Sequence, residues 1–359
     1  MIQVIEKLKL VALNFEKFLY ASNPHVVKSL QSMGFKEDEI RRIELFDWFQ
    51  GVGLYGYYKM YKWSEDCKYL DIIIKYFDTR IRDGLPEKNI NSMAPMLTML
   101  SILEDVDRPD YEELSKEWAQ WLYECHPRTE NGGLSHLTCE AKNEEELWDD
   151  TLFMSVLFLA KAGVYFNEQK YIDEALFQYS LHEYYLSERV SGLWYHGWTF
   201  DGQHNFTNAL WARGNSWITI FIPEMIELLG QNTHYKQMMH TYEKQCHSLM
   251  NLQTENGLWH TLLNESDTYL EASASAGFIY GILKGVNDEL LDNIDLSNLH
   301  KGIESLINLI DENGIVQQVS AGTAMGKDSL DYYRNIPIEP KPYGQAMTML
   351  ALCEYIRRK

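Results

Sequence analysis

Two adjacent carboxyl groups, Asp149 and Asp150, stand between Trp148 and an apolar stretch that begins at Thr151. Neighbouring acids in apolar surroundings can hold one proton at neutral pH, as a general acid must. The start of a helix has the opposite effect, because the positive end of the helix dipole stabilises a carboxylate and lowers its pKa. A simple helix-capping role fits the same motif. The motif therefore predicts an acid catalyst or a cap, and it leaves the pKa of Asp150 open.

The segment Gly192–Trp217 holds four tryptophans, two histidines, an aspartate and an arginine within 26 residues. An indole ring offers a flat face on which the C–H face of a sugar can stack, while His, Asn and Arg side chains supply groups that bind hydroxyls. Core packing explains any one of these tryptophans equally well. As a cluster with so many polar companions, they favour a carbohydrate ligand.

Arg213 lies two residues after Trp211 and four before Trp217. A guanidinium group can grip a carboxylate through two parallel hydrogen bonds, and the amides of a helix start from Asn215 onward would add donors for the same anion. In a chain rich in acids, a structural ion pair is the alternative. We predict that Arg213 lies near the carboxylate of the ligand.

A phrase that begins with glycine recurs four times, at intervals of 59, 65 and 57 residues; its copies start at Gly133, Gly192, Gly257 and Gly314. This period is typical of a pair of helices with its connections. The fourth residue or the fifth residue of each copy is polar, namely His136, His196, His260 and Gln317. We expect the first two histidines to face one space, with His260 a more distant wall or only a structural echo.

The elements that carry these loops are predicted to be helices of two kinds. Some are apolar on nearly every face and therefore enclosed; they are Asn91–Leu103, Thr151–Gly163 and Trp217–Leu229. Others have one apolar stripe and one polar face; they are Asp110–Cys125, Tyr171–Leu186 and His234–Met250. Alternation of enclosed and striped helices predicts an all-α double ring of helical hairpins. Pro223 is expected to kink or split its helix.

Composition narrows the function further. The chain has 359 residues, 45% of them hydrophobic, without a Pro-, Gly- or Ser-rich linker, so we expect a single domain over residues 1–359. A formal net charge of −20 makes nucleic acid and anionic membrane poor partners, and an anionic ligand would need cations gathered in its pocket. Five scattered cysteines and the lack of a signal or membrane segment predict a soluble, cytoplasmic protein. No metal and no cofactor are expected, because neither metal-ligand spacing nor a phosphate-binding glycine pattern occurs.

Four motifs in this order resemble the unsaturated rhamnogalacturonyl hydrolases of glycoside hydrolase family 105, which are related to the unsaturated glucuronyl hydrolases of family 88. The motifs are LWDDTLFMSVLFLA (147–160), GLWYHGW (192–198), WARGNSW (211–217) and YLEASASAG (269–277). The resemblance implies an (α/α)6 barrel. It also implies removal of a 4,5-unsaturated uronic acid from the non-reducing end of oligosaccharides that polysaccharide lyases produce.

The same resemblance implies residue roles. Asp150, two residues after the tryptophan of the motif, would be the catalytic acid/base that protonates C4 of the C4=C5 bond and then helps water to add at C5. The residues implied as substrate contacts or cavity walls are Trp48, His136, His196, Trp211, Arg213 and Trp217. Asn91 stands where many relatives carry a second aspartate. An amide can orient substrate or water but cannot share a proton, which puts the role of a second carboxylate in doubt.

Two other functions fit the sequence. A sugar epimerase or isomerase could be built on the same ring of helices, with His196 and His260 as its proton-transferring pair. A non-catalytic carbohydrate-binding protein would show affinity without turnover. The sequence leaves open the sugar in the leaving-group position, whether rhamnose, glucosamine or a sulfated sugar, and the oligomeric state.

Overall fold

The computed structural model describes residues 1–322 and 324–358. Its inner helices form a closed ring, in which each packs against the next and the last packs against the first. They are α4 (Trp48–Ser64), α6 (Ala94–Ser101), α8 (Leu157–Tyr165), α10 (Ala212–Leu229), α12 (Ala272–Asn287) and α15 (Pro342–Arg357). The helices that alternate with them along the chain are α1 (Ile2–Phe18), α5 (Cys67–Asp83), α7 (Pro109–Glu124), α9 (Gln169–Leu186), α11 (Tyr235–Leu252) and α13 (Leu296–Asn308). The architecture is the predicted (α/α)6 barrel.

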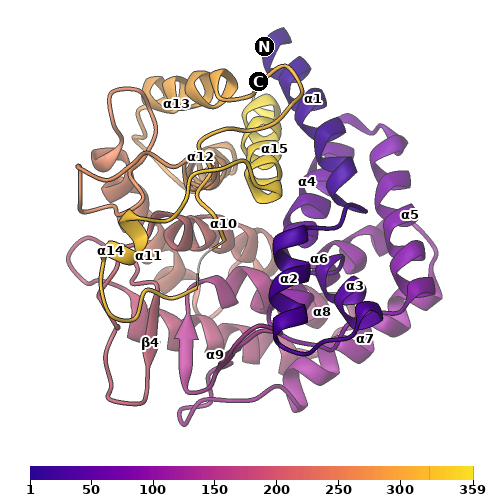
Figure 1. Ribbon diagram of the computed structural model, residues 1–359. Coiled ribbons are helices and arrows are strands. Elements are labelled where there is room, and N and C mark those ends of the chain that lie inside the picture. Colours follow the sequence, from indigo (N-terminus) through magenta and orange to yellow (C-terminus); the bar gives the residue numbers. More distant parts are fainter. Residues whose placement is uncertain (323, 359) are drawn as a thin grey trace.

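The chain closes the ring with its two ends. Helix α15 packs against both α4 and α1, so the termini lie near each other (Figure 1). The remaining helical segments are α2 (Pro24–Ser32), α3 (Glu37–Glu44), α14 (Asp331–Arg334), the 3-10 turns Asn91–Met93 and Ile102–Glu104, and a π-helical turn at Leu152–Val156. None of the helices in the described residues is long and apolar enough to cross a membrane.

The enclosed helices are apolar on nearly every face because most of their residues are buried, and this pattern is visible in the sequence. In α10 every residue from Ala212 to Ile226 is buried. The helix begins five residues before the predicted start at Trp217, because its first turn is polar although it is enclosed. It also continues through Pro223, so the predicted split is wrong. The lost hydrogen bond and the ring of Pro223 disfavour a helix, but packing on all sides outweighs that local cost.

The glycine-led phrases form turns that follow the outer helices. Gly192, Gly257 and Gly314 have positive φ values of 74°, 85° and 81°, which favour glycine. In the first copy the positive φ of 85° falls on Gly132 and not on Gly133, so that phrase is shifted by one residue relative to our prediction. Each turn returns the chain toward the next inner helix.

Two short antiparallel strand pairs cover one end of the ring. Strand β1 (His136–Leu137) pairs with β2 (Lys142–Asn143), and β3 (Glu146–Trp148) pairs with β4 (Gly197–Thr199). In the second pair Trp148 lies opposite Gly197, and the N–H of Asp149 donates to the carbonyl of His196 at 3.1 Å. This pairing brings the two most chemically suggestive loops of the sequence together.

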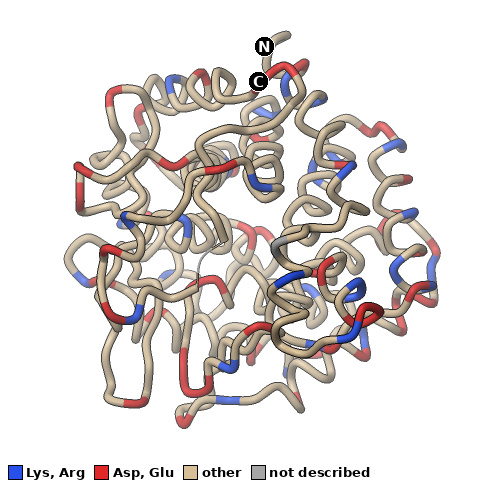
Figure 2. Tube along the Cα trace, in the orientation of Figure 1, with Lys and Arg blue, Asp and Glu red and all other residues tan. Residues whose placement is uncertain are grey.

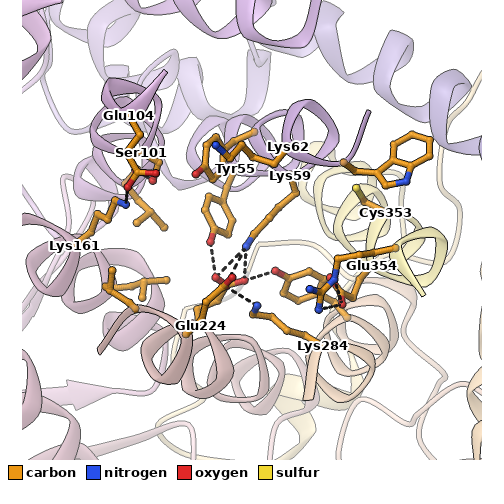
Figure 3. Close-up of a pocket in the computed structure, with 18 of the residues that line it drawn as sticks. Tyr55, Lys59, Lys62, Ser101, Glu104, Lys161, Glu224, Lys284, Cys353 and Glu354 are labelled. Atoms are coloured by element: carbon orange, nitrogen blue, oxygen red, sulfur yellow. Dashed lines mark hydrogen bonds and ion pairs between the residues drawn. The ribbon is translucent and has the colours of Figure 1, made fainter. Parts of the chain in front are cut away.

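The opposite end of the ring holds a cavity of about 740 Å³ between the C-terminal halves of the inner helices (Figure 3). Glu224, which is 5% exposed, lies at its centre. It accepts hydrogen bonds from the hydroxyls of Tyr55 and Tyr280 and an ion pair from Lys59 at 3.0 Å. Burial alone would raise the pKa of Glu224, but the charges of Lys59 and Lys284 and the two hydroxyls outweigh it and lower the pKa to about 2.

We expect Glu224→Gln to lower the free energy of unfolding by about 3 kcal/mol, because Lys59 would lose its buried partner. A depressed carboxyl pKa stabilises the fold above the unfolded value near 4.5, and that contribution is lost as the pH falls toward 2. Urea unfolding between pH 7 and pH 3 should therefore show a flatter acid limb in the variant. The control is Glu227→Gln, whose side chain is 55% exposed and should change stability by less than about 1 kcal/mol. Equal losses in both variants would contradict the prediction.

Candidate active site

A second cavity, of about 490 Å³, opens at the end of the ring where the inner helices begin. Six of the eight predicted site residues line it: Trp48, Asn91, His136, Asp150, Trp211 and Arg213. They come from the starts of α4 and α10, from the segment before the π-helical turn that leads into α8, from the turn before α6 and from β1. The barrel thus gathers residues that are more than 160 positions apart onto one wall. The two others, His196 and Trp217, lie immediately behind this wall.

The carboxyl pair stands at the start of the helical segment that leads into α8. The side chain of Asp150 is 17% exposed and faces the cavity, whereas Asp149 is fully buried. Burial raises the pKa of Asp149 well above its usual range, and the adjacent charge of Asp150 raises it further. Burial would also raise the pKa of Asp150, but its interactions with His196, His136 and Asp149 outweigh burial and lower the pKa. The pKa values of the two carboxyls are therefore shifted in opposite directions, so a shared proton is held more tightly by Asp149 than by Asp150.

The close approach of α10 is what encloses Asp149. Gly214, in the first turn of α10, lies so near that a Cβ atom there would be 2.2 Å from Asp149 Oδ2. Asp149 is thus held against the start of α10, where the peptide dipoles favour negative charge. Both opposing effects that the sequence suggested therefore act on Asp149, and burial outweighs the helix start.

His196 connects the pair to the opposite wall. Its Nε2 lies 3.4 Å from Asp150 Oδ2, and its Nδ1 lies 2.7 Å from the hydroxyl of Tyr333. The imidazole packs against the rings of Trp148 and Trp211, with centroid distances of 5.1 and 4.4 Å. His196 is 1% exposed, so it acts on the cavity through Asp150 and not as an open wall residue.

His136 is held in a different way. Its ring stacks on Trp148 at 4.3 Å with an interplanar angle of 3°, and its Nδ1 lies 2.8 Å from the hydroxyl of Thr151. Burial lowers the pKa of His136 to about 3, so the ring is neutral in the free protein. A neutral ring nitrogen at the cavity wall can donate to or accept from a sugar hydroxyl.

The aromatic wall has two layers. Trp48 lines the cavity and stacks on Tyr343 at 4.7 Å. Trp217 is 1% exposed and lies behind Trp48, with its ring edge-on at 6.0 Å and stacked on Phe153 at 5.2 Å. Trp217 is therefore placed to support Trp48, and its direct contact with a substrate stays a prediction.

Arg213 reaches the cavity but is tightly held. Nη1 donates to the hydroxyl and carbonyl of Ser320 at 2.7 and 3.0 Å, and Nη2 donates to the carbonyl of Ala321 at 2.9 Å. Glu271 lies 3.7 Å from Nη1, and the guanidinium packs on the ring of Tyr343 at 4.8 Å. The ion-pair alternative is thus present together with the cavity position. A bidentate clamp on a substrate carboxylate would require Arg213 to exchange some of these contacts.

Asn91 begins the turn before α6 and lines the cavity, where its backbone N–H donates to Asn89 Oδ1 at 2.9 Å. Several site residues had not been singled out from the sequence. Trp148, Tyr332, Lys341 and Tyr343 line the cavity, and Tyr333 contacts His196. Trp148 could have been inferred from its place beside the carboxyl pair. The remaining four lie after residue 320, where no local pattern connects them with Asp150.

His260 lies away from this cavity. Its Nδ1 hydrogen-bonds to the carbonyl of Thr268, and a β-bridge joins His260 to Leu270. It is not among the residues that line the cavity in the described part of the chain. The reading of His260 as a structural echo of the repeated phrase fits this position.

Asp149, Asp150 and His196 place ligand-type atoms within 4.8 Å of one another, which is close enough to hold a metal ion. We predict that the cluster serves proton transfer, because Asp149 is fully buried beside Asp150 and both burial and the charge of Asp150 raise its pKa. Dialysis against EDTA should therefore leave the turnover number unchanged within about twofold, and added Zn²⁺ should not raise it. Loss of turnover after dialysis, restored by a divalent ion, would show that the cluster holds a metal instead.

Comparison with known proteins agrees with this geometry. The model of Glycosyl Hydrolase Family 88 matches residues 25–359. The chain is 30% identical over 319 residues to the unsaturated rhamnogalacturonyl hydrolase YesR of Bacillus subtilis, a match that covers 88% of this chain and 90% of YesR. A possible member of the GH105 family from Salmonella enterica serovar Paratyphi A superposes with a TM-score of 0.90 at 41% identity, covering 98% of this chain and 93% of that one. A similar protein from Klebsiella pneumoniae gives 0.90 and 40% over the same shares. The chain belongs to the family that the Glycosyl Hydrolase Family 88 model describes and is a glycoside hydrolase of the related family 105.

Proposed function

We propose that the protein releases 4,5-unsaturated uronic acid from the non-reducing end of oligosaccharides made by polysaccharide lyases, with the unsaturated rhamnogalacturonan disaccharide as the preferred substrate. The observation that carries the proposal is the carboxyl pair, in which Asp150 faces an aromatic cavity while Asp149 holds a proton behind it. The similarity to YesR, whose name states the rhamnogalacturonyl specificity, supports the choice of sugar.

The cavity suits an anionic sugar in spite of the net charge of −20. Acidic and basic residues are interspersed over the outer helices and loops in the view of Figure 2. The charged residues that line the cavity in the described chain are Glu140, Asp150, Arg213 and Lys341. Two cations therefore balance two acids there, and the local field does not repel a uronate as the outer surface does.

In the proposed reaction, Asp150 receives the proton of the pair and transfers it to C4 of the C4=C5 bond. The positive charge that develops at C5 is shared with the ring oxygen, and water adds at C5 while Asp150 takes up the proton that water releases. The resulting hemiketal opens to a ketone, and collapse at C1 expels the neighbouring sugar with its own oxygen. One water molecule is consumed, and the carboxyl pair returns to its starting state when Asp150 passes the proton taken from water back to Asp149. Because one acid serves both steps, the carboxylate separation that distinguishes retaining from inverting glycosidases does not apply.

The epimerase alternative finds less support. It assigned proton transfer to His196 and His260, but His196 faces Asp150 and Tyr333 through its two nitrogens and His260 binds the backbone of Thr268. A binding protein without turnover would not need a buried protonated acid beside an ionised one. We also propose a cytoplasmic location, which the five free cysteines support.

The test is incubation of the protein with unsaturated rhamnogalacturonan disaccharide, followed through the ultraviolet absorbance of the conjugated double bond. We expect the absorbance to disappear and free rhamnose-containing sugar to be released. Unsaturated disaccharides with glucosamine or a sulfated sugar as leaving group, and the saturated disaccharide, form the comparison series. Turnover of the saturated sugar alone would favour the epimerase, and binding by calorimetry without any turnover would overturn both enzymatic functions.

A further inference from the structure

Tyr333 lies behind the cavity wall and contacts His196, whose imidazole ring faces Asp150. Tyr333 is fully buried and does not line the cavity, so it cannot touch a substrate. Its hydroxyl lies 2.7 Å from His196 Nδ1 and receives the backbone N–H of Gly326 at 3.1 Å. Burial raises the pKa of Tyr333, so the phenol keeps its proton at neutral pH.

The position of the phenolic proton follows from these contacts. The Tyr333 hydroxyl accepts a hydrogen bond from the Gly326 N–H. It has one proton of its own to donate. Two acceptors lie within reach, His196 Nδ1 at 2.7 Å and the sulfur of Met325 at 3.4 Å. A thioether is a weak acceptor, so the proton goes to His196 Nδ1. An imidazole whose Nδ1 accepts this hydrogen bond carries its own hydrogen on Nε2, the nitrogen that lies 3.4 Å from Asp150 Oδ2.

We propose that Tyr333 is a positioning residue for the hydrolysis, which fixes His196 in the Nε2–H tautomer and so directs an N–H at the catalytic carboxyl Asp150. This inference rests on the proposed role of Asp150. In the other tautomer a lone pair on Nε2 would face Asp150 Oδ2 at 3.4 Å, and repulsion would replace the attraction of an N–H for the carboxylate. A histidine held in the wrong tautomer by loss of its partner is known to disable a general acid–base site.

The segment around Tyr333 is itself anchored to the loop that carries His196. The hydroxyl of Thr207 donates to the carbonyl of Gly326 at 2.9 Å, and the methyl end of Met325 packs on Gly197, where an added Cβ would be 2.3 Å away. The hydroxyl of Tyr269 donates to the carbonyl of Tyr333 at 3.1 Å. Contacts with Thr207, Gly197 and Tyr269 therefore hold the segment that carries Tyr333 and keep its Oη beside His196 Nδ1.

The first experiment reads the tautomer directly and does not depend on activity. Long-range ¹H–¹⁵N spectra of protein with labelled histidine, with His196 assigned by its absence in His196→Gln, should show an unprotonated Nδ1 and a protonated Nε2. In Tyr333→Phe the signal should shift toward the Nδ1–H form or a mixture. A protonated Nδ1 in the unmodified protein would overturn the proposal, even if the hydrolase activity itself is found.

The second experiment uses kinetics. Tyr333→Phe should lower kcat about 30-fold and leave KM within about twofold, since the lost hydrogen bond orients His196 beside Asp150 and does not contact the substrate. In the His196→Gln background the same change should lower kcat less than about twofold, because Tyr333 acts through His196. Tyr242→Phe is the matched control: it removes a buried hydroxyl that donates to the carbonyl of Gly281 at 2.5 Å, far from the site, and should leave kcat unchanged. Equal losses of kcat from Tyr333→Phe in both backgrounds would overturn the inference and leave the proposed hydrolase function standing.

Discussion

Asp150→Asn is expected to lower kcat by at least about 10³-fold, with KM changed only a few-fold. An amide keeps the size of the side chain and its place at the cavity, but it can neither give a proton to C4 nor take one from water. The fold should remain intact, because Asp150 is 17% exposed and its removal eliminates one of two adjacent acids. The measurement is steady-state turnover of the unsaturated disaccharide, together with a thermal unfolding curve.

Asp149→Asn provides the informative comparison. Asparagine resembles the protonated acid that Asp149 is in the free protein, so we expect correct folding and a smaller loss of kcat, on the order of 10-fold to 100-fold. The loss reflects the missing proton of the pair. A variant Asp150→Asn that keeps more than a tenth of the activity, while Asp149→Asn loses nearly all of it, would reverse the roles of the two residues.

Gly214→Ala is expected to have the second-largest effect. The new methyl group would lie 2.2 and 2.7 Å from the carboxyl oxygens of Asp149, a distance at which something must move. Because α10 is packed on every side, the carboxyl pair is the element that yields, and overpacking of this kind costs about 1–3 kcal/mol. We expect kcat to fall about 100-fold or more, since a displaced Asp149 also displaces Asp150 from the cavity.

The matched control for Gly214→Ala is Gly56→Ala in α4, another enclosed helix. The nearest atom to a Cβ at Gly56 is the terminal methyl of Met349 at 3.0 Å, the end of a flexible side chain that can turn away. Alanine also favours a helix over glycine by about 1 kcal/mol, so stability should change little and kcat not at all. If Gly214→Ala behaves like Gly56→Ala, the carboxyl pair is less confined than the contact with α10 indicates.

The sequence alone was sufficient for the architecture and for most of the cavity wall. Helices enclosed on all faces and helices with one apolar stripe alternate along the chain, and this local pattern predicts a double ring because each kind of surface can be buried in only one way. The glycine-led phrases and the motif around Asp150 likewise depend on neighbours in the chain. Six of the eight predicted site residues consequently line one cavity.

The tertiary structure decided how those residues are used. Which carboxyl of the pair keeps the proton depends on burial by α10 and on His196, neither of which is adjacent to Asp150 in the chain. Trp217 lies behind the cavity wall, and Arg213 contacts Glu271 and Ser320, which are distant from it in the sequence. Tyr333 meets His196 across 137 positions. Helical periodicity follows from neighbouring residues, whereas the pKa of a carboxyl and the tautomer of a histidine are fixed by groups that only the closed ring brings within hydrogen-bonding distance.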